Sequence, residues 1–225
     1  MNESAKARSW WGELEFSVIC GKGIDIGCGP DPVTASCTKF DHEDGDANVI
    51  SHIISEVFDF VYSSHCLEHM RDPQKALQEW WKLVKPGGYL FVTVPDEDLY
   101  EQGVFPSRFN NDHKATFTIS KSKSWSPVSY NVLDLGRSLS GGEIISFCLQ
   151  DRLYDRALMS SGKDIPPFFI RIIGFFCKFR LISCFFHKSV FLNRALSLYF
   201  PVDQTAPPFN AQAQIQLIVR KQVAT

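Results

Sequence analysis

Apolar positions along the chain fall into short runs that end in glycines or small polar residues. One run covers residues 18–26 and stops at a glycine turn, a second begins at Phe58, and a third covers residues 89–94. Runs of this kind are typical of buried parallel strands whose carboxyl ends open toward a ligand. The pattern therefore predicts an α/β fold built on a mostly parallel sheet.

Between the second and third apolar runs, apolar residues recur at the spacing of a helix. Asp72 can cap a helix that starts at Pro73. The apolar positions that this helix would bury are Ala76, Leu77, Trp80, Trp81 and Val84. The Lys-Pro-Gly-Gly sequence at 85–88 is expected to end the helix. Strand, helix and strand in succession predict a βαβ unit with parallel strands.

The flanking segments complete the predicted sheet. Residues 1–17 are expected to form a lead-in helix or arm, anchored by Trp10, Trp11, Leu14 and Phe16. After the glycine turn, two prolines leave only residues 33–37 before a strand at 38–41, so the first helix should be short or absent. Residues 131–150 predict a helix and then a strand. Alternation at 213–219 predicts a last strand.

Composition narrows the class of protein. The chain has 225 residues, enough for a single domain over 1–225 with a sizeable core, and a net charge of -2, which favours no nucleic-acid partner. Its seven cysteines include no Cys-x-x-Cys pair, and the polar N-terminus has no signal-peptide core. We therefore expect reduced thiols, mostly buried, in a cytoplasmic protein. The acidic residues show no spacing that singles out a metal site.

The glycine turn carries the first candidate chemistry. Gly27 and Gly29 allow positive φ angles and leave room for a small molecule close to the backbone. A dinucleotide-binding turn needs a third glycine at position 32, which here is Pro32, and Asp31 would repel phosphate. The turn suits an uncharged ribose and a cationic ligand better than it suits a phosphate.

Two motifs resemble those of class I, Rossmann-like S-adenosylmethionine (SAM) methyltransferases. Asp25-x-Gly27-x-Gly29 resembles their first motif, and residues 58–69, ending in Leu-Glu-His, resemble their fourth-strand motif. The resemblance implies a mostly parallel sheet with an antiparallel last strand, helices on both faces, and SAM as cofactor. It also implies a set of cofactor-binding residues: Asp25, Gly27, Cys28, Gly29, Asp41, Asp46, Ala47, Ser63, Ser64 and His65. Asp41 is expected to accept hydrogen bonds from the ribose, or else to be a solvated turn acid.

Residues 94–114 resemble a bacterial type 11/23-like subgroup associated with surface-polysaccharide gene clusters. The resemblance implies O-methylation of a sugar or glycan intermediate, with Tyr100, Glu101 and Arg108 at the acceptor and His113 as general base. In a structural alternative, Arg108 and Glu101 merely pair in a lid. Other open functions are a SAM-binding module without catalysis, methylation of a lipid or small metabolite, and, less favoured, a nicotinamide enzyme.

An apolar and basic stretch at 163–200 precedes the last strand, within a helical insert predicted for 155–205. It carries six Lys or Arg residues and one acid, and its basic residues interrupt it too often for a membrane-spanning helix. Three alternatives stay open: packing onto its own domain as a lid, a homodimer interface, or peripheral contact with an anionic membrane.

Overall fold

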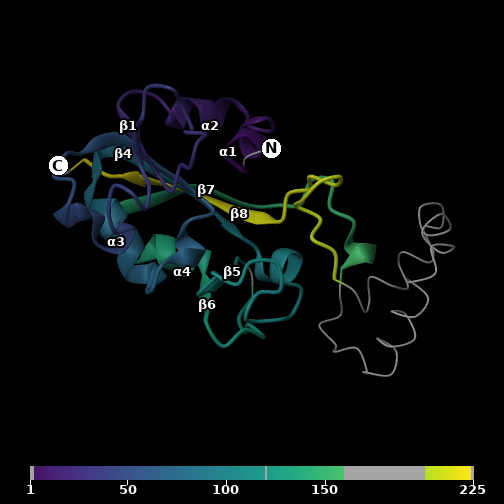
Figure 1. Ribbon diagram of the computed structural model, residues 1–225. Helices are drawn as coiled ribbons and strands as arrows, with labels where there is room; N and C mark the ends of the chain where they lie inside the picture. The colour runs from purple at the N-terminus through teal and green to yellow at the C-terminus, as the bar shows by residue number, and fades with distance from the viewer. Residues whose placement is uncertain (1–2, 120, 160–200, 224–225) are drawn as a thin grey trace, which may run out of the picture.

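The computed structural model describes residues 3–119, 121–159 and 201–223 and centres on a six-stranded sheet (Figure 1). The strand order is β2-β1-β3-β4-β8-β7. The strands are β1 (Gly23–Ile26), β2 (Thr38–Phe40), β3 (Phe58–Ser64), β4 (Val84–Pro95), β7 (Gly142–Gln150) and β8 (Gln214–Lys221). Strands β1 to β4 run parallel, and β8 lies antiparallel between β4 and β7. The predicted sheet and its inserted last strand are confirmed.

Helices cover both faces of the sheet (Figure 1). The α-helices are α1 (Glu3–Arg8), α2 (Glu13–Val18), α3 (Pro73–Lys82) and α4 (Val132–Arg137). The 3-10 helices are η1 (Ala47–His52), η2 (Leu67–His69) and η4 (Arg156–Leu158), and η3 (Glu97–Glu101) is a π-helix. A two-stranded sheet, β5 (Thr116–Thr118) and β6 (Ser129–Asn131), lies beside η3. Figure 1 shows α1 and α2 on one side of the main sheet and α3 and α4 on the other.

Alternation along the strands divides the core into two layers. Val61 faces the larger layer, which includes Trp80 of α3, whereas its neighbours Phe60 and Tyr62 belong to the smaller layer with Val18 of α2. Successive strand residues point to opposite faces, so a strand covered on both sides is apolar throughout. This arrangement explains the unbroken apolar run at residues 60–62 in the middle of β3.

Helix α3 begins as predicted but ends sooner. The Asp72 side chain accepts a hydrogen bond from the backbone N–H of Lys75, and Pro73 occupies the first turn. The helix stops at Lys82, and residues 85–88 lie within β4 instead of forming the helix end. Gly87 has a φ of +83° and the β3–β4 register shifts there, so the glycines form an irregular strand entry.

Strand β1 is shorter than its apolar run. Val18 is the last residue of α2, and a turn at Gly21, with φ of +90°, separates it from the strand. A Cβ on Gly23 would lie 1.9 Å from the Phe60 ring, so only glycine fits at the strand start. Residues 27–37 form turns without a helix, as the two prolines predicted.

The N-terminal anchors are only partly as expected. Trp11 packs on the smaller core layer, with its ring centroid 5.3 Å from that of Phe91. Trp10, Leu14 and Phe16 are exposed, so the prediction that they anchor the arm is wrong. From the arm, only Val18 and the partly buried Trp11 and Ile19 pack in this layer, and Trp10 instead lies against the Arg152 guanidinium.

The apolar stretch at 163–200 lies outside the described residues. Among the helices that the structure does describe, none has the length and apolar character needed to cross a membrane.

Candidate active site

A cavity of about 470 Å³ opens where β1, β2 and β3 end. It is lined by Gly27, Phe40, Asp41, His42, Gly45, Asp46, Ala47, Asn48, His65, Cys66, His69, Met70, Asp112 and Lys114. The carboxyl ends of parallel strands share one edge of a sheet, which is where ligands bind in open α/β folds. Of the ten residues predicted to bind the cofactor, five line this cavity: Gly27, Asp41, Asp46, Ala47 and His65.

The glycine turn brings bare backbone to the cavity edge. Gly27 has a φ of +77°, and its N–H donates to the carbonyl of Phe40, which joins the turn to the end of β2. Gly29 has a φ of +53°, and a Cβ added there would meet nothing within 4 Å. The space above Gly29 is therefore open, as cofactor binding requires.

Asp41 directly follows β2 and connects the two strand ends. Its Oδ2 atom accepts a hydrogen bond of 2.7 Å from the Gly29 N–H, and Oδ1 accepts one from His42 N–H. Burial opposes ionisation of Asp41, but the hydrogen bonds from His42 and Gly29 outweigh it and hold the pKa of Asp41 below its usual value. A carboxylate thus lies at the cavity edge, where the ribose-binding prediction requires it.

Asp25 and Cys28 support the turn from below. Asp25 is 1% exposed, and its Oδ2 atom accepts a 2.6 Å hydrogen bond from Val33 N–H. Burial raises the pKa of Asp25 to about 7. Cys28 is also buried, and burial raises the pKa of its thiol. Neither residue lines the cavity, so both act by shaping the turn.

Asp46 and Ala47 form the far wall. The Asp46 carboxylate caps η1 by accepting from Asn48 N–H, and it also pairs with Arg71. These contacts fix the backbone of Ala47 at the start of η1, beside the cavity. The placement agrees with the prediction for this pair.

Of the three residues predicted to bind the cofactor at the end of β3, only His65 lines the cavity. Ser63 is fully buried and donates its hydroxyl to the carbonyl of Ile26, so it joins β1 and β3 without lining the cavity. Ser64 is 7% exposed and is also not among the lining residues. His65, with a φ of +53°, turns the chain into the cavity wall. Cys66 follows it, and burial raises the pKa of that thiol to about 12, so the thiol stays protonated.

The residues present fit an adenosyl sulfonium. The cavity edge has an ionised carboxylate for ribose hydroxyls, an open glycine turn, and no basic side chain at positions 27–31. Three aspartates, Asp41, Asp46 and Asp112, and one lysine, Lys114, line the cavity, and this excess of acid favours a positively charged ligand. SAM is therefore the cofactor that this site accommodates.

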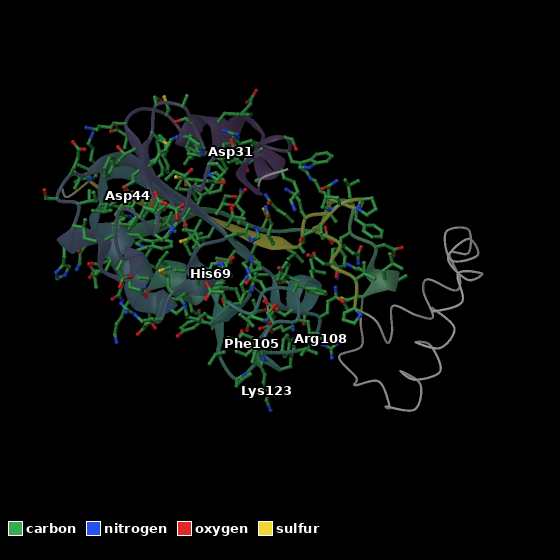
Figure 2. The ribbon with its side chains drawn as sticks, viewed as in Figure 1. Asp31, Asp44, His69, Phe105, Arg108 and Lys123 are labelled. Carbon is green, nitrogen blue, oxygen red and sulfur yellow. The ribbon has the colours of Figure 1, made fainter. Side chains whose placement is uncertain are left out.

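Next to this cavity lies a buried cluster built around His113. Its Nδ1 atom is 2.6 Å from Oε1 of Glu101, and both side chains are buried. The Tyr100 ring lies 5.2 Å from the His113 ring, measured between centroids. Tyr100, Glu101 and His113, three of the four predicted acceptor residues, thus come together. Arg108 is half-buried on the loop that follows η3 (Figure 2).

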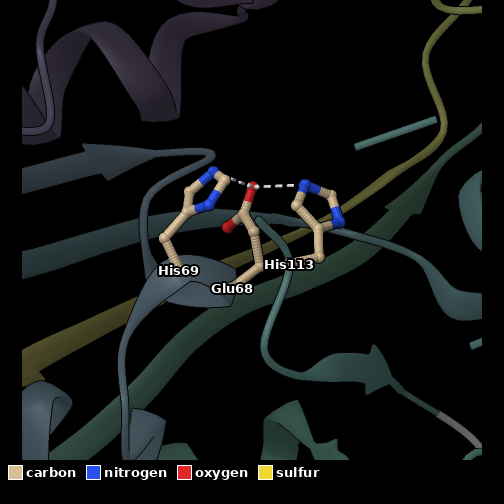
Figure 3. A group of neighbouring side chains, drawn as sticks. All are labelled: Glu68, His69 and His113. Carbon is tan, nitrogen blue, oxygen red and sulfur yellow. Dashed lines mark ion pairs between the residues drawn. The ribbon is translucent and has the colours of Figure 1, made fainter. Parts of the chain in front are cut away.

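Glu68 and His69 complete the cluster; the sequence offered His69, like His65, as a less favoured base that would rather shape the cofactor pocket, and it gave Glu68 no role beyond its motif. Oε1 of Glu68 lies 3.9 Å from Nε2 of His113 and 4.0 Å from Nε2 of His69 (Figure 3). Burial by itself raises the pKa of Glu68, but the imidazoles around it outweigh burial and hold that pKa below its usual value. In the sequence, only the adjacent positions of Glu68 and His69 at the end of the strand motif could have singled them out, because His113 lies far along the chain.

The strand order, the cavity at the strand ends and the glycine turn beside Asp41 are together typical of Rossmann-like SAM-dependent methyltransferases. Comparisons with known proteins agree. The sequence profile of a family described as a methyltransferase domain matches residues 15–126. The matched residues are therefore the methyltransferase domain of a SAM-dependent enzyme. A search of curated protein sequences found no match.

Solved structures share the fold at low sequence identity. A methyltransferase-like protein from Bacillus halodurans is 13% identical, with a TM-score of 0.51, covering 99% of this chain and 100% of its own. A sarcosine dimethylglycine methyltransferase-like protein from Galdieria sulphuraria is 14% identical, with a TM-score of 0.45 and coverages of 98% and 84%. Haemonchus contortus phosphoethanolamine N-methyltransferase 2, solved with S-adenosylhomocysteine, is 12% identical, with a TM-score of 0.44 and coverages of 90% and 49%.

Proposed function

We propose that the protein methylates a hydroxyl group of a sugar or glycan intermediate in surface-polysaccharide assembly. The observation that carries the proposal is the buried His113–Glu101 pair beside the cofactor cavity. A sugar hydroxyl is a poor nucleophile until its proton is removed, and an imidazole held by a carboxylate is suited to remove it.

The side chains would divide the work as follows. Glu101 fixes the orientation of His113 through Nδ1, which leaves Nε2 to take the hydroxyl proton. Tyr100 packs its ring beside that imidazole, and Arg108, on the loop that follows η3, is the residue proposed to contact the acceptor. Asp41 and the glycine turn hold the ribose. SAM, when bound, supplies a methyl group on sulfur, and its transfer forms an O–CH3 bond while the S–CH3 electron pair remains on sulfur.

The subgroup resemblance of residues 94–114 favours a sugar over other acceptors, and the general base favours oxygen over nitrogen. A neutral amine already carries a lone pair and needs no base to attack, whereas a hydroxyl does. A buried base is therefore more useful for an O-methyltransferase.

The test is methyl transfer from isotopically labelled SAM by the full chain. Acceptors should include sugar nucleotides, lipid-linked sugars, and amine metabolites as a separate arm. We expect label in a sugar hydroxyl and a loss of at least 100-fold in His113→Gln, with no change in His52→Gln, which alters an exposed histidine. Label found only in amines or lipids would overturn the sugar assignment.

A further inference from the structure

We infer that Glu68, His69 and His113 bind a divalent transition-metal ion beside the cofactor cavity. The three side chains offer one carboxylate oxygen and two imidazole nitrogens, all within 4.8 Å of one another. Two adjacent ligands come from η2, and the third comes from the loop that precedes β5 (Figure 3). Two histidines and one carboxylate form a ligand set that zinc and iron accept while keeping open positions for substrate.

Both histidines aim the same ring atom at Glu68. The Nε2 atoms of His113 and His69 lie 3.9 Å and 4.0 Å from a single oxygen, Oε1 of Glu68. These separations are too long for hydrogen bonds. Metal bonds of 2.0–2.2 Å would bring the ligand atoms to about 3–3.4 Å from one another, a contraction of roughly 0.6–1 Å.

A carboxylate orients each histidine from its other side. Glu101 Oε1 lies 2.6 Å from Nδ1 of His113, and Asp112 Oδ2 lies 3.0 Å from Nδ1 of His69. An Nδ1–H that donates to a carboxylate leaves the Nε2 lone pair directed at the metal. Such carboxylate–histidine pairs are the usual outer support of metal sites, and here both imidazoles have one.

Glu68 supplies an independent reason to expect a cation. Its side chain is fully buried, and within the described part of the chain neither carboxylate oxygen has a hydrogen-bond partner. The nearest imidazole, that of His65, has its Nδ1 atom 3.5 Å from Oε1 of Glu68. Burying a carboxylate without donors is costly, and a bound cation would satisfy it. An ordinary structural salt bridge would instead bring one donor into contact.

The position of the site connects it to the proposed function. His69 lines the cofactor cavity, as does its supporting residue Asp112. If the proposed function holds, a cation here would bind the acceptor oxygen and lower the pKa of its hydroxyl, with the released proton passing to water. In the metal-bound form Nε2 of His113 would be a ligand, and the cation would replace that imidazole in activating the hydroxyl that the proposed function methylates. Metal binding itself does not depend on which acceptor is methylated.

The experiment measures metal binding directly. The full chain, stripped with a chelator and dialysed, is titrated with Zn²⁺ by calorimetry and with Co²⁺ by absorption spectroscopy, which distinguishes imidazole and carboxylate ligands from thiolates. We expect one equivalent bound, at least 100-fold weaker binding in Glu68→Gln and His69→Gln, and 10–100-fold weaker binding in Glu101→Gln and Asp112→Asn. His52→Gln, at an exposed histidine, is the matched control and should bind as tightly as the unaltered chain.

Two outcomes would overturn the inference: no stoichiometric binding, or equal Zn²⁺ affinity in Glu68→Gln and the unaltered chain. Calorimetry with SAM, run on each variant, shows whether the fold and cofactor site are intact. Methyl transfer to sugars that persists in chelator, without metal binding, would remove the metal and leave the proposed function standing. Metal binding without methyl transfer to any sugar would remove the proposed function and leave the metal site standing.

Discussion

The Nδ1 atom of His113 lies 2.6 Å from Oε1 of Glu101, and both side chains are almost fully buried. The two residues are 12 positions apart, on opposite sides of a polar loop. Through this contact the Glu101 carboxylate holds the His113 ring in one orientation. It places an oriented imidazole beside the cofactor cavity.

Replacement of His113 or Glu101 should therefore lower the turnover rate and leave cofactor binding unchanged. We expect His113→Gln to lower kcat by about 10²–10³-fold and Glu101→Gln by about tenfold or more, because the second variant keeps the imidazole and loses only its orientation. The dissociation constant for SAM should stay within about twofold in both. Steady-state kinetics beside calorimetry measure the two quantities. A kcat in His113→Gln above a tenth of the unaltered value would contradict the assignment.

Asp41 should control the affinity for SAM. Asp41→Asn removes the charge that ribose hydroxyls would meet, and we expect binding to weaken by about 10–100-fold, the usual range for hydrogen bonds to a charged group. Glu43→Gln is the control, since Glu43 is an exposed acid two residues along. Isothermal calorimetry with SAM and its demethylated product checks the expectation. Equal affinities in the two variants would mean that Asp41 is only a turn residue.

The two turn glycines should respond differently to alanine. At Gly27 the new Cβ would lie 2.7 Å from the Cys66 side chain at a φ of +77°, so Gly27→Ala should lose roughly 1–3 kcal/mol of unfolding free energy. At Gly29 the Cβ meets open space, and we expect a smaller loss, below about 1 kcal/mol, together with weaker SAM binding. Urea unfolding and calorimetry separate these effects. The opposite order of stabilities would show that the turn geometry is wrong.

Buried Asp25 should make stability depend on pH. Its pKa is raised to about 7 in the folded chain from an unfolded value near 3.8, so the folded state holds the extra proton between those pH values. The free energy of unfolding, relative to Asp25→Asn, should therefore fall as pH rises from about 4 to 7, by roughly 1.4 kcal/mol for each pH unit crossed, and then level off.

Urea unfolding of the unaltered chain and Asp25→Asn at several pH values measures this difference. Asparagine can still accept the Val33 N–H, so the variant isolates the charge. Asp134→Asn, at an exposed acid in α4, should show no such trend. A difference between Asp25→Asn and the unaltered chain that is flat from pH 4 to 8 would place the pKa of Asp25 near its ordinary value.

Local patterns were reliable where a side chain's role depends on its immediate neighbours. The Asp72 cap and Pro73 start of α3 were predictable because capping involves only residues within one turn. The parallel pairing of β3 and β4 followed from the strand–helix–strand succession. The prediction failed where packing competes with pattern, as in the exposed Leu14 and Phe16 of the arm.

Sequence alone determined the cofactor class, because the glycine turn and Asp41 follow strands whose carboxyl ends must share one sheet edge. It could not decide which polar residues at those strand ends face the ligand. Ser63 turns its hydroxyl to Ile26 while His65 enters the cavity wall, and that difference arises from the backbone turn at His65, where the strand has ended. Only the tertiary structure joined Glu68 and His113, because a contact between residues so far apart is set by loop packing and leaves no periodic trace in the chain.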